Sequence, residues 1–82
     1  MWLEKNNKLI KSYKFKDFTE AFSFMAAVAI EAEKMNHHPY WSNLWDTVNF
    51  ELYTHDAGNT VTDKDRKLAD KIETLYCKYK QE

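Results

Sequence analysis

The chain has 82 residues, with 12 basic and 13 acidic side chains and a net charge of -1, so we expect one domain spanning residues 1–82. This balance argues against a nucleic-acid binder that relies on a positive surface, and the longest apolar stretch, Phe24 to Ile30, is too short to cross a bilayer. A single cysteine and an N-terminus without a signal-like apolar region indicate a cytoplasmic protein with no internal disulfide.

The chain begins with a pattern typical of two short strands. Apolar and polar residues alternate over roughly residues 8–16, which predicts a strand. Its apolar positions are Leu9, Tyr13 and Phe15. Trp2 and Leu3 predict the start of a shorter partner strand, and the asparagines at 6–7 predict the turn between the two.

A long helix is predicted next. Asp17 and Glu20 have the spacing of a capping box, in which side chains accept hydrogen bonds from the free backbone N–H groups at a helix start. Pro39 restricts the backbone of the residue before it, so we expect the helix to end near Met35. We expect its apolar stripe to pack into the core. The stripe comprises Phe18, Phe22, Met25, Ala29 and Ala32, widened by Ala21 and Val28.

The second half of the chain repeats this order. Residues 41–54 alternate again, and because that is long for one strand, we expect a hairpin that turns near Trp45–Thr47. Its apolar face comprises Val48, Phe50 and Leu52. After a loop over residues 55–59, Thr62 and Asp65 resemble a second capping box that opens another helix. The apolar face of this helix comprises Leu68, Ile72, Leu75 and Tyr79.

The predicted elements come in the order ββ-α-ββ-α. An antiparallel sheet with helices on one face accommodates this order with short connections. We therefore predict an α+β fold with a four-stranded antiparallel sheet and two helices packed on one face.

The three histidines all fall in or just after predicted connections, where reactive groups usually lie on a rigid scaffold. His37 and His38 follow the long helix, and His55 follows a strand. Glu33 and His37 are four positions apart, so we expect the carboxylate to face the imidazole and raise its basicity. An ordinary histidine at a helix end is the alternative, since the helix dipole alone favours it there by about 0.3–1 kcal/mol.

Metal and nucleophile chemistry are less well supported by the spacing. Adjacent residues in an extended chain point to opposite sides, so His37 and His38 are poorly placed to share one ion, and no metal is expected. Cys77 has no histidine near it in the sequence, and we expect a buried or interfacial thiol rather than a nucleophile.

The histidines occur in a pattern that resembles the pterin-4a-carbinolamine dehydratase family. The matching residues are Glu33, His37, His38, Pro39, Trp45, His55 and Asp65, with flanking matches at 15–18, 20–25 and 54–58. The resemblance extends from about Trp2 to Leu75, and its motifs are specific because several residues recur at fixed gaps.

This resemblance implies an enzyme that removes water from 4a-hydroxytetrahydropterin to give quinonoid dihydropterin, in the recycling of pterin after aromatic hydroxylation. The family uses histidines and no cofactor. It implies that His37 and His55 act as acids toward the leaving hydroxyl, and that His38 binds the pterin and assists proton loss. Pocket residues would be Asn36, Pro39, Thr54 and Asp56, with Glu33 and Asp65 in support. Imidazole suits both proton transfers at neutral pH.

The resemblance also implies a homodimer or homotetramer, and members of the family in animals bind a homeodomain transcription factor. A non-catalytic interaction module of the same fold, similar to a transcriptional coactivator, is therefore the alternative function. Members usually begin with a further N-terminal helix, which we expect this chain to lack. Where the family has Gly-Leu-Thr after the loop, this chain has Asn59-Thr60-Val61-Thr62, one residue longer.

Overall fold

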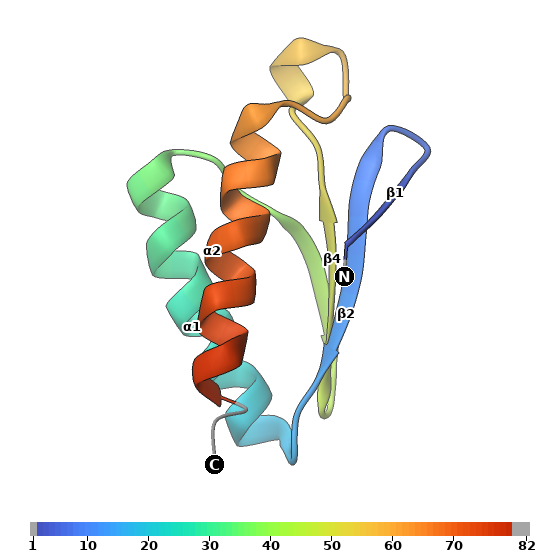
Figure 1. The fold of residues 1–82 in the computed structure, drawn as a ribbon. Helices are drawn as coiled ribbons and strands as arrows, with labels where there is room; N and C mark the ends of the chain where they lie inside the picture. The colour runs from blue at the N-terminus through green and yellow to red at the C-terminus, as the bar shows by residue number, and fades with distance from the viewer. Residues whose placement is uncertain (1, 80–82) are drawn as a thin grey trace.

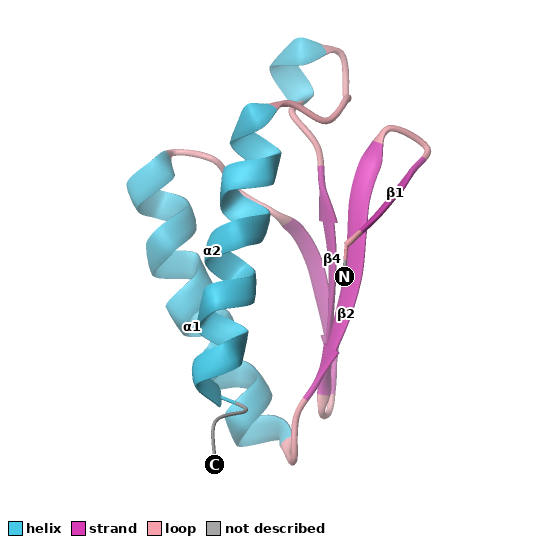
Figure 2. Cartoon of the chain, in the orientation of Figure 1, coloured by secondary structure: helices cyan, strands magenta, loops and turns pink. Residues whose placement is uncertain are grey.

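The computed structural model describes residues 2–79 and has two layers, a four-stranded sheet and a pair of helices that cover one of its faces (Figures 1 and 2). The elements in chain order are β1 (Leu3–Lys5), β2 (Lys8–Lys14), α1 (Phe18–Met35), β3 (Tyr40–Leu44), β4 (Thr47–Leu52), a short 3-10 turn η1 (His55–Ala57) and α2 (Asp63–Tyr79). This arrangement confirms the predicted α+β class and the predicted element order.

The sheet has the strand order β1-β2-β4-β3, and every neighbouring pair is antiparallel. In this register Tyr13 of β2 lies opposite Val48 of β4, and both side chains are buried under the helices. The predicted hairpin between β3 and β4 is confirmed, although it contains no glycine. Trp45 adopts the left-handed backbone conformation there, with φ 51.

Helix α1 has the predicted ends. The Asp17 side chain accepts a hydrogen bond from the Glu20 backbone N–H at 2.8 Å, as expected of an N-cap. At the other end Asn36 has φ 53 and its backbone N–H donates to the Ala32 and Glu33 carbonyls. Asparagine tolerates this left-handed conformation better than most residues do, so the helix stops there and the chain turns.

The predicted core stripe of α1 is partly wrong. Phe18, Phe22 and Ala29 are exposed, whereas Phe24 is fully buried. The residues that α1 does bury are Ala21, Phe24, Val28 and Ala32. The helix carries apolar residues on more than one side, so the periodicity could not say which side meets the sheet. Packing against the sheet and α2 selects the side with Phe24.

Helix α2 lies beside α1 on the same face of the sheet (Figure 1). Leu68 and Ile72 are fully buried, and Leu75 and Tyr79 pack partly buried against the core, which confirms the predicted face. Cys77 is exposed in this chain, so it is not buried within the fold, and the interfacial thiol stays a prediction. Among residues 2–79, no helix has the length and apolar character to cross a membrane.

Candidate active site at the ends of the helices

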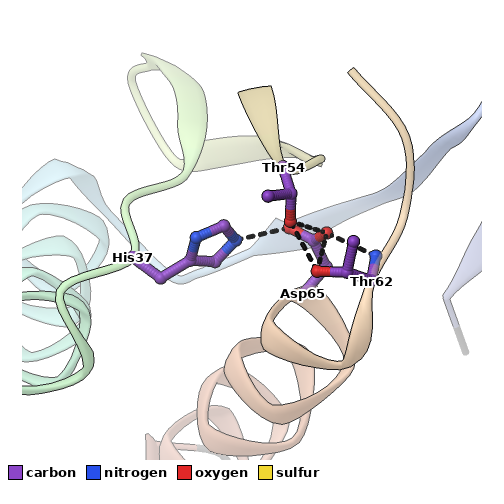
Figure 3. A network of polar contacts seen from close by, with 4 residues as sticks. All are labelled: His37, Thr54, Thr62 and Asp65. Carbon is purple, nitrogen blue, oxygen red and sulfur yellow. Dashed lines mark hydrogen bonds and ion pairs between the residues drawn. The ribbon is translucent and has the colours of Figure 1, made fainter. Parts of the chain in front are cut away.

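His37 follows the left-handed turn at Asn36, and its backbone N–H donates to the Ala32 carbonyl at 3.1 Å. This turn aims the imidazole at the first turn of α2. The Nε2 atom lies 2.6 Å from Oδ1 of Asp65, and the His37 side chain is 11% exposed (Figure 3). Two segments that are 28 positions apart in the sequence therefore meet through one hydrogen bond.

Asp65 is fully buried and is the centre of a polar network. Its Oδ2 atom accepts hydrogen bonds from the Thr54 hydroxyl at 2.8 Å and from the Thr62 backbone N–H at 2.9 Å. The two threonine hydroxyls are also 2.6 Å apart. These donors stabilise an ionised carboxylate, which joins the end of β4 to the start of α2 and to the loop after α1.

An ionised carboxylate only accepts hydrogen bonds, so the Nε2 atom of His37 must be its donor. The other ring nitrogen of His37, Nδ1, points away from Asp65 (Figure 3). A carboxylate that holds one imidazole nitrogen sets the tautomer and leaves the second nitrogen for proton exchange. The pair therefore has the arrangement of a positioned acid–base group.

Glu33 pairs with a different histidine from the one predicted. Its Oε1 atom lies 2.9 Å from Nε2 of His38, and both side chains are largely exposed. The expected contact with His37 is wrong because α1 ends at Met35 and Asn36 turns left-handed. Spacing of four residues brings side chains together only while the helix continues.

His55 opens the η1 turn and is exposed. Its Nδ1 atom lies 3.0 Å from Oδ1 of Asn59. Within the described chain, the hydrogen bonds of His55 and of His38 are separate from the network around Asp65. The sequence did not point to Asn59 as a partner of His55. The one hint was that the loop after His55 departs from the pattern of the family that the sequence resembles.

The remaining predicted pocket residues lie around this end of the fold. Thr54 belongs to the Asp65 network, whereas Asn36 caps α1 with its backbone and Pro39 is half-buried. Asp56 lies beside the network. The open pocket there has a volume of about 430 Å³ and is lined by Thr54, Asp56, Ala57, Thr62, Asp63 and Lys64.

A larger groove of about 520 Å³ lies between α1 and α2, with Met35 and Leu75 among its lining residues. None of the three histidines lines either hollow, but the smaller pocket is lined by Thr54 and Thr62 of the Asp65 network and is therefore the one next to His37. In the part of the chain that the structure describes, no group of three histidine, cysteine or acidic side chains is arranged to hold a metal ion.

Comparisons with known proteins place the chain among related sequences. The family model described as "Pterin 4 alpha carbinolamine dehydratase" matches residues 1–75. Proteins of Opitutus terrae and Solibacter usitatus, each named "Putative pterin-4-alpha-carbinolamine dehydratase", are 49% identical over 74 residues, which is 90% of this chain and 76% and 77% of theirs.

Solved structures show the same fold. The crystal structure of a transcriptional coactivator/pterin dehydratase from Brucella melitensis superposes with a TM-score of 0.86 at 42% identity, covering 90% of this chain and 80% of that one. A pterin dehydratase-like protein described as a RuBisCO assembly factor in the alpha-carboxysome has a TM-score of 0.73 at 22% identity, covering 92% and 86%. The second likeness shows the fold alone.

Proposed function

The chain belongs to the pterin 4 alpha carbinolamine dehydratase family, and from this we propose that it catalyses dehydration of 4a-hydroxytetrahydropterin to quinonoid dihydropterin, in pterin recycling. The observation that carries the proposal is the buried contact between His37 and Asp65. A histidine with one nitrogen held by a buried carboxylate is equipped to exchange a proton through the other nitrogen.

The reaction needs two proton transfers. The bond between C4a and the hydroxyl oxygen breaks, and that oxygen takes up a proton and leaves as water. The neighbouring ring nitrogen loses a proton, and its electron pair forms the new double bond to C4a. We propose that His37 and His55 supply the proton to oxygen, and that His38 binds the pterin and assists proton loss from nitrogen.

The proposed substrate pocket lies beside the Asp65 network. Thr54 and Asp56 line it, and both threonine hydroxyls of the network are committed to Asp65 or to each other. The proposed contacts of Asn36 and Pro39 with the pterin rest on the family resemblance. Positioned acid–base side chains accelerate a reaction by roughly 10²–10⁴-fold, and we propose that histidines alone supply this acceleration here.

The decisive experiment is a stopped-flow assay of synthetic carbinolamine with the purified chain and with the His37→Gln and His55→Gln variants. We expect the parent to exceed the uncatalysed rate and each variant to lose roughly 10²-fold or more, with circular dichroism showing a retained fold. A parent at the uncatalysed rate would refute the enzymatic function. Two fully active variants would refute the histidine roles only.

A role in assembly is the second candidate, and an exposed apolar face favours it. Phe18, Phe22 and Ile30 on α1 are 50%, 57% and 58% exposed, and such side chains on a small chain favour a subunit or partner contact. We propose a homodimer or homotetramer that buries this face. Sedimentation analysis of Phe22→Asp should show smaller species than the parent. Oligomers of the same size in the variant and the parent would refute the proposed interface. A monomeric parent would refute the homo-oligomer and leave a coactivator-like partner as the candidate for this face.

A further inference from the structure

The loop after β4 contains a contact that the proposed mechanism has not used. His55 and Asn59 are joined by a hydrogen bond of 3.0 Å between Nδ1 and Oδ1. No hydrogen bond within residues 2–79 reaches the Nε2 atom of His55, and the side chain is exposed. The contact therefore acts on one ring nitrogen and leaves the other open to a ligand.

The backbone holds Asn59 in place for this contact. Asn59 has φ 59, in the left-handed region, and its backbone N–H donates to the Thr54 carbonyl at 3.1 Å. The loop is closed by Thr54, whose backbone N–H donates to the Thr60 carbonyl at 2.8 Å. Backbone hydrogen bonds close this loop, so the contact of the Asn59 side chain with His55 is not needed to close it.

The same loop connects two of the histidines. Thr54, which closes it, also donates its hydroxyl to Asp65, and Asp65 accepts from His37. Asn59 lies in the same loop, directly after Gly58. One loop therefore supplies the partner of His55 through Asn59 and supports His37 through Thr54 and Asp65.

We propose that Asn59 is a positioning residue for His55: its side-chain oxygen keeps the proton on Nδ1 and fixes the ring, so that Nε2 stays available to the substrate. This inference rests on the proposed dehydratase function. An amide oxygen only accepts, so it holds Nδ1–H in both the neutral and the protonated imidazole.

The proton that moves during turnover is then the one on Nε2. The protonated ring gives this proton to the leaving hydroxyl as the C4a–O bond breaks, and water departs. The neutral ring keeps its lone pair on Nε2 and recovers a proton there from solvent. Asn59 itself takes up and releases no proton, and it does not touch the reacting atoms.

The test compares Asn59→Gly and Asn59→Asp with the parent. Glycine keeps the left-handed backbone and removes the amide, whereas aspartate tolerates that backbone and keeps an acceptor oxygen. Asn7→Gly is the matched control, because Asn7 also has a positive φ, 62, but lies in the β1–β2 turn. The readouts are the nitrogen-15 NMR tautomer of His55 and the separate values of kcat and KM.

We expect the parent, Asn59→Asp and Asn7→Gly to show the Nδ1–H tautomer of His55, and Asn59→Gly to shift toward Nε2–H. In Asn59→Gly we expect kcat to fall about tenfold with little change in KM, because ring orientation and not binding is lost. A parent with Nε2–H, or an Asn59→Gly variant with an unchanged tautomer, would overturn the inference. The NMR readout needs no turnover. An inactive parent would therefore refute the proposed function, while the tautomer of His55 would still test whether Asn59 positions its ring.

Discussion

The Nε2 atom of His37 lies 2.6 Å from Oδ1 of Asp65, and the carboxylate is completely shielded from solvent. This contact joins the loop after α1 to the first turn of α2, at the positive end of the α2 dipole, where a negative charge is favoured. The pair thus has a structural and a chemical consequence: it ties two elements together and holds the imidazole in one orientation.

Replacing Asp65 by asparagine tests both consequences. The amide cannot serve as a charged acceptor for His37 and for the Thr54 and Thr62 donors at once, so we expect a loss of about 1–3 kcal/mol in the free energy of unfolding. We also expect dehydration to slow by roughly 10²-fold. Urea titration and the stopped-flow assay measure the two effects. Asp70→Asn, at an exposed aspartate of the same helix, is the control and should leave both values unchanged.

The contact between Glu33 and His38 should matter little for stability. Both side chains are exposed, at 80% and 58%, and exposed ion pairs contribute about 0–1 kcal/mol. We expect Glu33→Gln to change the free energy of unfolding by less than about 0.5 kcal/mol and to leave the NMR signals of His37 in place. A shift of the His37 signals in this variant would indicate that Glu33 contacts His37, as the sequence suggested, and would contradict the structure.

Two phenylalanines of α1 should respond oppositely to truncation. Phe24 is fully buried among aromatic neighbours that include Phe15, whose ring centroid is 4.8 Å away, so we expect Phe24→Ala to cost about 3–5 kcal/mol. Phe22 is 57% exposed, and Phe22→Ala serves as its control. At concentrations where the chain is monomeric, thermal or urea unfolding should show only a small loss for Phe22→Ala. Equal losses would mean that α1 is rotated from its place in this structure.

The Tyr13 hydroxyl predicts a loss of stability in alkali. It donates to Glu73 at 2.6 Å. Burial is the larger cause and this hydrogen bond the second, and together they raise the pKa of Tyr13 well above its usual value of 10.0. A raised folded-state pKa contributes stability below pH 10 that is lost as the pH rises further. We expect the free energy of unfolding to fall by about 1.4 kcal/mol per pH unit above pH 10 from this group.

Tyr13→Phe should remove this alkaline slope, whereas Tyr40→Phe, at a tyrosine that is 60% exposed, should retain it. Urea titrations at a series of pH values between 9 and about 12 measure the slopes, since that window begins below the ordinary tyrosine pKa. A slope that is the same in Tyr13→Phe and in the parent would show that other groups cause the alkaline loss.

Local sequence features determined most of the secondary structure. The Asp17–Glu20 spacing predicted the start of α1 and Pro39 predicted its end near Met35, because capping and the proline restriction act over a few residues. The left-handed turn at Asn36 was seen only in the structure. The alternation around Phe50 gave the correct face of β4, since strand side chains alternate with a period of two. Strand β2 ends at Lys14, two residues short of the predicted end at 16.

Contacts between distant segments were decided only in the folded molecule. The sequence placed His37, His55 and Asp65 among the candidates. It did not show that His37 contacts Asp65, that Glu33 contacts His38, or that His55 contacts Asn59. It also could not choose between the two apolar sides of α1, where Phe24 and not Phe22 is buried. Periodicity and caps record interactions within one element, whereas these pairings depend on how α1, α2 and the sheet pack together.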